Sequence, residues 1–160
     1  MSEETGGAPD LRIEVRAFDH PDVVSLVDEI QDFYRERYGV EDVDTTPPAQ
    51  FAPPLGLFLI GYLGDEIVAS GGWRWLDSEA VEIKRMWVRP DARHRGVSRR
   101  MLAELESTAT AAGAVKVRLN TGFRQPEALA LYDSSGYQRT DERYGHYEHF
   151  EGAQFFVKIL

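Results

Sequence analysis

Apolar residues along the chain follow two periods, and the period changes from one segment to the next. Alternating apolar and polar positions, which are typical of a half-buried strand, run from Leu11 to Phe18. Apolar residues three and four apart, the period of a helix, run from Val23 to Tyr38, with Asp19-His20-Pro21 before them and Gly39 after them. The beginning of the chain therefore predicts one strand followed by one helix.

The middle of the chain predicts a hairpin and a further strand. An apolar run from Leu57 to Leu63 reaches a turn at Gly64-Asp65 and continues as a strand from Ile67 to Leu76. In that second strand Trp73 and Trp75 share one face and Arg74 takes the other. The two tryptophans fit either the core side of a sheet or the wall of a substrate channel.

The next strand is predicted from Ala80 to Val88, and strict alternation divides it into two faces. One face would hold Glu82, Lys84, Met86 and Val88, and the other Val81, Ile83, Arg85 and Trp87.

The remaining segments alternate between helix and strand. They are a helix from Val97 to Ala112, a strand from Val115 to Leu119, a helix from Pro126 to Gly136, and strands from Tyr137 to Thr140 and from Ala153 to Leu160. Antiparallel strands come first and helical crossovers later, which indicates an α/β (α+β) fold with a mixed sheet and helices on both faces. We expect one domain over residues 11–160 after a disordered tail of residues 1–10.

Composition narrows the chemistry. The 160 residues are 42% apolar and 28% charged, as in globular proteins, and no apolar run is long enough to cross a bilayer. The absence of cysteine excludes disulfides, thiolate metal ligands and a thioester intermediate on the protein. His146 and His149 have no third ligand in register, so no metal is expected. The N-terminus lacks the features of a secretory signal, and a cytoplasmic location is expected.

Positive charge is concentrated in one stretch. The net charge is −9, yet residues 84–100 hold seven lysines and arginines against the single acid Asp91. Glycine and arginines between a strand and a helix are typical of a phosphate site, because backbone N–H groups and the helix dipole point at the anion. A solvated helix start is the alternative. Nucleic acid is not expected as a partner, because the basic charge is confined to one loop.

The loop Arg93-His94-Arg95-Gly96-Val97-Ser98 resembles the Arg/Gln-x-x-Gly-x-Gly/Ala signature of the GNAT superfamily of N-acetyltransferases. It stands between a strand and a helix, as that signature does, and NTGFRQPEALALYDSSGY resembles the second conserved motif of the family. The resemblance covers nearly all of the chain after residue 11. It implies the acyl-CoA N-acyltransferase fold, a mostly antiparallel sheet of six to seven strands that splays between its fourth and fifth strands.

The resemblance also implies acetyl-CoA as co-substrate. The pyrophosphate would lie on the amides of the arginine loop, and the pantetheine arm along the backbone of the splayed strand. Asn120 would bond the pantetheine or a water near the thioester. Ser98 replaces the usual Gly or Ala but is small enough to be tolerated. The implied cofactor-binding residues are Met86, Trp87, Val88, Arg93, His94, Arg95, Gly96, Val97, Ser98, Arg99, Asn120 and Tyr132.

Without cysteine, direct attack of the amine on the thioester is the simplest mechanism, with an oxyanion donor implied at the backbone of Trp87 or Val88. By resemblance Tyr132 is the acid that protonates the leaving thiolate; the alternative is a packing aromatic. Glu82 is the candidate base, eleven positions before Arg93, and we expect it to face an apolar cleft that raises its pKa. A carboxylate paired with Lys84 or a neighbouring strand is the alternative.

The predicted function is acetyl transfer from acetyl-CoA to a primary amine. The acidic charge outside the arginine loop favours a small cationic amine, whereas Arg74 beside two tryptophans favours the carboxylate of an amino acid. Trp73, Arg74 and Glu82 are the candidate substrate residues. A non-enzymatic acyl-CoA sensor or interaction module is the alternative function. The acceptor, the acyl group and association into a homodimer stay open.

Overall fold

One mixed sheet organises the computed structural model, which describes residues 10–39, 47–93, 95–122, 126–144 and 152–160. In the described residues the sheet has seven strands in the order β1-β2-β3-β4-β5-β7-β6, and only β4 and β5 pair in parallel. The strands are β1 (Leu11–Val15), β2 (Gly56–Leu63), β3 (Glu66–Trp75), β4 (Ala80–Val88), β5 (Lys116–Gly122), β6 (Gln138–Thr140) and β7 (Ala153–Ile159). The mixed, mostly antiparallel sheet is therefore confirmed.

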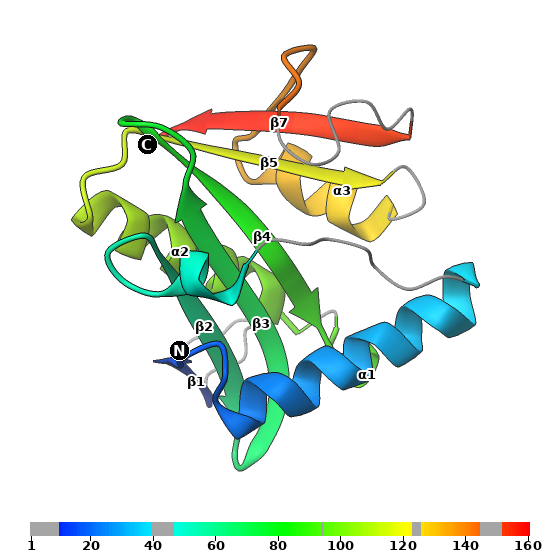
Figure 1. The fold of residues 1–160 in the computed structure, drawn as a ribbon. Helices are drawn as coiled ribbons and strands as arrows, with labels where there is room; N and C mark the ends of the chain where they lie inside the picture. The colour runs from blue at the N-terminus through cyan, green and yellow to red at the C-terminus, as the bar shows by residue number, and fades with distance from the viewer. Residues whose placement is uncertain (1–9, 40–46, 94, 123–125, 145–151) are drawn as a thin grey trace, which may run out of the picture.

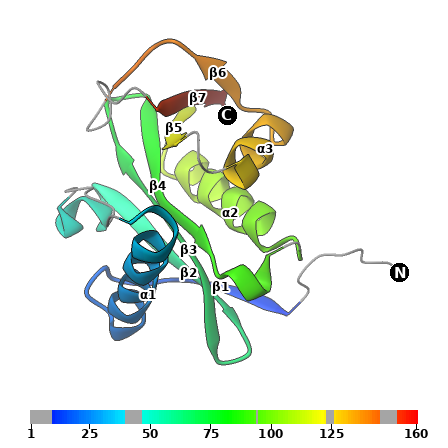
Figure 2. The ribbon, with the colours of Figure 1, turned by 90° about the vertical axis from the view of Figure 1, so that its right-hand side faces the viewer.

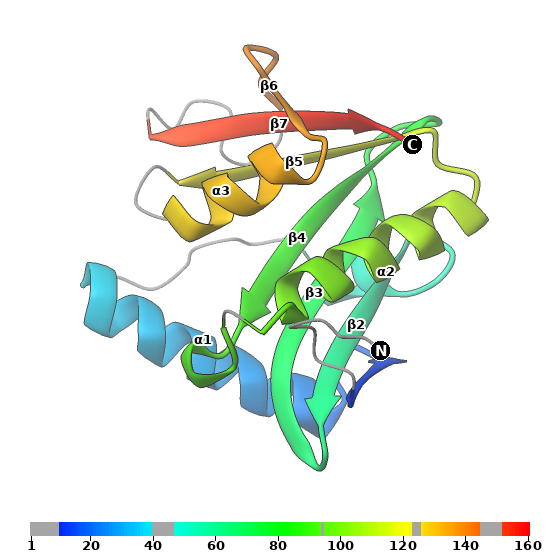
Figure 3. The ribbon, with the colours of Figure 1, turned by 180° about the vertical axis from the view of Figure 1, so that it is seen from behind.

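Helices cover both faces of this sheet, as predicted. Helix α1 (Pro21–Tyr38) lies on one face, and α2 (Val97–Ala111) and α3 (Pro126–Ser134) lie on the other (Figures 1, 2 and 3). The short 3-10 helices η1 (Pro48–Phe51) and η2 (Pro90–Ala92) occur in connections. The predicted ends of α1 are confirmed, because His20 accepts a hydrogen bond from the backbone N–H of Asp22 and Gly39 ends the helix at a φ of 76°.

The two faces carry separate apolar layers. Under α2, the buried side chains of Met101 and Leu105 pack with Val81 of β4 and Val117 of β5. Under α1, the core contains Val23, Leu26, Ile30, Phe51, Phe58, Ile60, Tyr62 and Trp87. The helical spacing in α1 and α2 thus buries one stripe of each helix against the sheet.

Strand β4 does not alternate strictly, and the predicted division of its faces is wrong beyond Lys84. Arg85 has a φ of 61°, and the pairing with β3 shifts by one residue between Ser70 and Gly72. A bulge of this kind turns the following side chains over. Trp87 therefore joins the α1 core, whereas Met86 and Val88 pack in the α2 core with Val81 and Ile83.

Strands β4 and β5 pair only at their beginnings. Ala80, Val81 and Glu82 face Lys116, Val117 and Arg118, and the parallel ladder extends no further among the described residues. Figure 1 shows the two strands diverging beyond this point. The splay implied between the fourth and fifth strands is confirmed, and it leaves the β5-facing edge of Met86–Val88 outside the ladder.

The expected disordered tail, apart from Asp10, lies outside the described residues.

Candidate functional site

Helix α2 begins next to the open edge of β4 without a capping side chain. Its N-cap residue Gly96 has a φ of 79°, a conformation that glycine adopts without strain, and the structure records no side-chain cap among the described residues. Val97 is buried in the core, and Ser98 is half-buried in that turn. Uncapped N–H groups at a helix start are suited to an anion.

The arginine side chains of the loop differ in direction and in their partners. Arg95 is exposed, and Arg99 donates hydrogen bonds to the hydroxyls of Ser134 (2.8 Å) and Ser135 (3.4 Å) at the end of α3. Arg93 turns inward: its Nε donates to the carbonyl of Val88 at 2.9 Å. His94 lies outside the described residues. Arg93 therefore ties the loop to the end of β4, and its guanidinium does not point away from the protein.

Aromatic rings hold Arg93 in that position. Its guanidinium carbon lies 5.1 Å from the ring centre of Trp87 and 5.3 Å from that of Phe33 on α1, and the two rings meet edge to face at 4.6 Å. The buried Nε1 of Trp87 has no hydrogen-bond acceptor in the described part of the chain. The end of β4 thus presents a rigid wall on its α1 side.

A row of charged side chains crosses the sheet on the α1 face, just before β4 and β5 part. Glu82 stands opposite Arg74 on β3 and opposite Arg118 on β5. Its carboxylate accepts hydrogen bonds from Arg74, with Nη2 at 2.9 Å and Nε at 3.1 Å, and Lys84 Nζ lies 3.7 Å away. Arg74 also donates to the side chain of Gln50 in η1 at 3.0 Å.

This environment corrects two expectations. Glu82 does not face an apolar cleft: it is buried between cations, which is the ion-paired alternative and favours the ionised carboxylate. Trp73 does not contribute to a substrate site with Arg74: it points to the opposite face, as the alternation predicted, and there its ring is buried under α2 and its Nε1 donates to Thr108 at 3.0 Å. The core interpretation of Trp73 is confirmed.

Tyr144 and Asn120 extend the row. Burial raises the pKa of Tyr144 well above its usual value, the charge of Glu82 adds to this, and Asn120, Arg118 and Arg74 oppose it. Asn120 is near enough to lower that pKa, although the phenol makes no hydrogen bond of ordinary geometry. Tyr144 therefore stays protonated near neutral pH, beside the buried ion pair.

Tyr132 lies on α3, where β4 and β5 have separated. Its ring packs against Tyr137 and Phe156, with centres 5.7 and 5.6 Å away. Burial raises the pKa of its phenol, and Tyr34 of α1 raises it further. The ends of α1 and α3 meet here, since Arg37 and Glu127 form an ion pair at 3.1 Å. Tyr132 is thus a protonated phenol between the two halves of the sheet, although its ring also serves packing.

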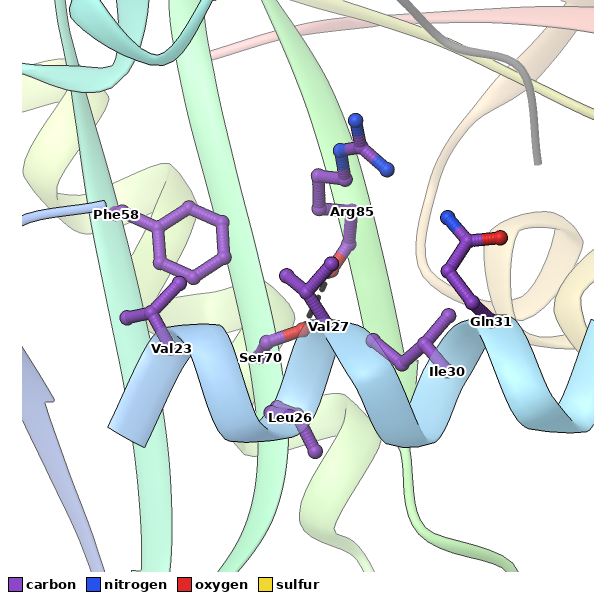
Figure 4. Close-up of a pocket in the computed structure, with 8 residues that line it drawn as sticks. All are labelled: Val23, Leu26, Val27, Ile30, Gln31, Phe58, Ser70 and Arg85. Carbon is purple, nitrogen blue, oxygen red and sulfur yellow. Dashed lines mark hydrogen bonds between the residues drawn. The ribbon is translucent and has the colours of Figure 1, made fainter. Parts of the chain in front are cut away.

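A pocket lies between α1 and the bulge of β4 (Figure 4). Ser70 fixes the bulge, because its hydroxyl donates to the carbonyl of Arg85 at 2.7 Å. The other lining residues are Val23, Leu26, Val27, Ile30, Gln31 and Phe58. The pocket wall is mainly apolar and belongs to the α1 core.

Arg118, Gln50 and Tyr144 belong to the site but were not predicted from the sequence, whereas Lys84 was predicted as a possible partner of Glu82. Arg118 had a signal, because it is two residues before Asn120 and so shares a strand face with a candidate. Gln50 and Tyr144 lie in connections, where periodicity gives no direction.

Two further classes of site find no support in the described residues. No group of three or more histidines, acids or cysteines there could hold a metal ion. None of the helices described is both long and apolar enough to span a membrane. His146 and His149 lie outside these residues.

Comparisons with known proteins agree with this arrangement. The profile of the acetyltransferase (GNAT) family matches residues 23–137. A protein of Azospirillum brasilense named IAA acetyltransferase is 32% identical over 117 residues, which are 72% of this chain and 76% of that protein.

Solved structures share the fold. A GNAT family acetyltransferase from Elizabethkingia anophelis with acetyl-CoA bound has a TM-score of 0.66 at 17% identity, over 94% of this chain and 99% of that one. The paiA N-acetyltransferase from Thermoplasma acidophilum in complex with coenzyme A has a TM-score of 0.73 at 14% identity, over 93% and 99%. At these identities the likeness shows the fold alone.

Proposed function

The chain belongs to the acetyltransferase (GNAT) family, and on that basis we propose that it acetylates the primary amine of a small molecule. Membership makes it an acetyl-CoA-dependent N-acetyltransferase; the acceptor and the roles of individual residues are our proposal. One observation carries it: β4 leaves β5 after Glu82, beside the uncapped start of α2. A cytoplasmic location and a homodimer stay predictions.

The arginine loop is our proposed pyrophosphate site. The amides from Gly96 onward would bond the phosphate oxygens, with Ser98 and the side chains of Arg95 and Arg99 beside them. Arg93 acts indirectly, because it holds the loop against Val88. The backbone of Met86–Val88, which lies outside the ladder with β5, would bond the pantetheine arm, and Asn120 would face the thioester from β5.

The proposed chemistry needs a base and an acid on opposite sides of the thioester. Glu82 takes a proton from the ammonium, directly or through water, and the amine nitrogen then bonds to the acetyl carbon. A backbone N–H near Trp87 or Val88 donates to the oxyanion. When the carbon–sulfur bond breaks, the phenol of Tyr132 gives its proton to the thiolate, and the second proton that the nitrogen loses as it becomes an amide restores the phenol, directly or through water. The phenol is protonated before transfer, because burial keeps its pKa above the usual value.

We expect thiol release from acetyl-CoA only when a suitable amine is present. A panel of amino acids, polyamines and aminoglycosides, assayed for free thiol, tests the proposal. Tight binding of coenzyme A without turnover on any amine would instead favour the acyl-CoA sensor.

We expect Gly96→Glu to abolish binding of coenzyme A in calorimetry. A side chain at a φ of 79° strains the loop, and a carboxylate there repels the pyrophosphate. Gly64→Glu is the matched control, because Gly64 also has a positive φ of 61° but lies in the β2–β3 turn with open space around it. Equal affinity in the two variants would refute the phosphate site.

We expect Tyr132→Phe to lower kcat by about 100-fold or more, the usual contribution of a positioned acid, with the KM for acetyl-CoA little changed. Tyr137→Phe is the control, because it removes the hydroxyl of an adjacent buried ring, which bonds Glu106 at 2.8 Å. Steady-state kinetics compares the variants. Full kcat in Tyr132→Phe would mean that this ring only packs.

We expect Glu82→Gln to lower kcat/KM and to remove the fall in rate at low pH, which arises when the base is protonated. The same change leaves Arg74 and Lys84 without their buried counter-charge, and the free energy of unfolding should drop by about 3–5 kcal/mol. Circular dichroism at the assay temperature checks that the variant is folded, so that a lower rate is not caused by unfolding. Glu82→Asp retains a carboxylate and should keep the pH dependence; an unchanged profile in Glu82→Gln would exclude the base role.

A further inference from the structure

The α1 face of the sheet buries more positive than negative charge at one place. Arg74, Glu82 and Arg118 are neighbours across β3, β4 and β5, and Lys84 follows Glu82 on the same face. Their side chains are 21%, 1%, 12% and 5% exposed, in the order Arg74, Glu82, Arg118, Lys84. Among the described residues, three cations and one carboxylate therefore share this nearly buried layer.

Glu82 pairs with two of these cations. It accepts a hydrogen bond from Arg74 Nε at 3.1 Å, and its other oxygen lies 3.7 Å from Lys84 Nζ. Arg118 bonds a different acid: its Nη2 donates at 2.8 Å to Glu142, whose side chain is 65% exposed. A salt-screened surface carboxylate is a weak partner for a buried guanidinium.

The other nitrogen of the Arg118 guanidinium has no acceptor. Nη1 is buried and makes no hydrogen bond within the described part of the chain. A buried N–H without an acceptor is costly, so such groups in native proteins usually mark a place that a ligand or water fills. Tyr144 lies close by, because its ring centre is 5.8 Å from the guanidinium carbon of Arg118, and its buried hydroxyl has no hydrogen-bond partner among the described residues either. Both groups would donate to an oxygen placed between them.

We propose that Arg118, supported by Arg74 and Lys84, binds a carboxylate of the acceptor, so that the substrate is an amine that also carries a carboxylate, such as an amino acid. The proposal rests on the acetyltransferase function above. Guanidinium groups bind carboxylates through paired, charge-assisted hydrogen bonds. Glu82, opposite Arg118, is placed for the positive end of the same zwitterion.

The same cluster argues against a polycation. A polyamine or an aminoglycoside would bring additional ammonium groups toward three cations, where repulsion in a dry site is strong. The acidic charge of the whole molecule does not change this, because among the described residues of the cluster one buried carboxylate, Glu82, stands against three cations, which suits one ammonium group and not several. Of the two acceptor classes that the sequence allowed, a small cationic amine and an amino acid, the cluster therefore favours the amino acid.

The first test compares matched acceptors on the unmodified protein. Amino acids and the corresponding amino amides, which lack the negative charge, are assayed for thiol release from acetyl-CoA. We expect kcat/KM to be about 10- to 100-fold higher for the acids, the equivalent of one hydrogen bond between charged groups. Equal or better use of the amides and of polyamines would overturn the proposal while leaving the acetyltransferase function intact.

The second test uses Arg118→Gln, with Arg12→Gln as the matched control on the edge strand, where the arginine side chain is 49% exposed. Arg118→Gln should raise the KM for amino acids by about 10- to 100-fold and leave the KM for acetyl-CoA and the use of amides unchanged. Arg118→Lys should recover part of the loss. An equal loss for acids and amides would contradict a carboxylate site.

A binding measurement tests the carboxylate site separately from the acetyltransferase function. Calorimetry of the coenzyme A complex with N-acetyl amino acids and with N-acetyl amino amides needs no turnover. If the N-acetyl amino acids bind, the amides do not, and Arg118→Gln loses this binding, the carboxylate site is supported. This holds even if no amine is acetylated, a result that would contradict the proposed function and not the carboxylate site. No difference between acids and amides in either assay would overturn the carboxylate site.

Discussion

The parallel ladder between β4 and β5 stops at Glu82 and Arg118, and the candidate site depends on where it stops. Before that point the strands hold charged side chains side by side on a continuous sheet. Beyond it, the backbone of β4 no longer pairs with β5 in the described part of the chain, and α1 and α3 approach each other from opposite faces through Arg37 and Glu127. One structural feature thus separates a layer of buried charged side chains from a length of β4 that lies outside the ladder with β5.

The bulge at Arg85 decides which face of the sheet each following side chain of β4 takes. A shift of one residue moves every following side chain to the other face, so Trp87 turns to α1 while Met86 and Val88 pack under α2. Trp87 then supports Arg93, which in turn fixes the glycine loop to the end of β4. The bulge at Arg85 therefore places Trp87 where it contacts Arg93, and this contact connects the end of β4 to the start of α2.

Charge is distributed in two layers that the net value of −9 conceals. Around Gly96 the arginines are partly exposed and suit a phosphate in contact with water. Around Glu82 the cations are buried, where a low dielectric strengthens both attraction and the penalty for an unpaired group. The first layer suits a cofactor shared by a whole family, and the second is the one that we propose to select the acceptor.

The sequence by itself determined the elements, their order, the splayed fold and the loop at Gly96, because hydrophobic period, helix caps and a local motif are properties of neighbouring residues. It also indicated Glu82, Asn120 and Tyr132 as candidate site residues, from their places relative to motifs that resemble those of the family. Only the tertiary structure decided that Trp73 is core, that Trp87 changes face, and that Arg118 and Tyr144 meet Glu82. These outcomes depend on a bulge and on the register between strands far apart in the chain, and side-chain alternation within one strand carries no information about either.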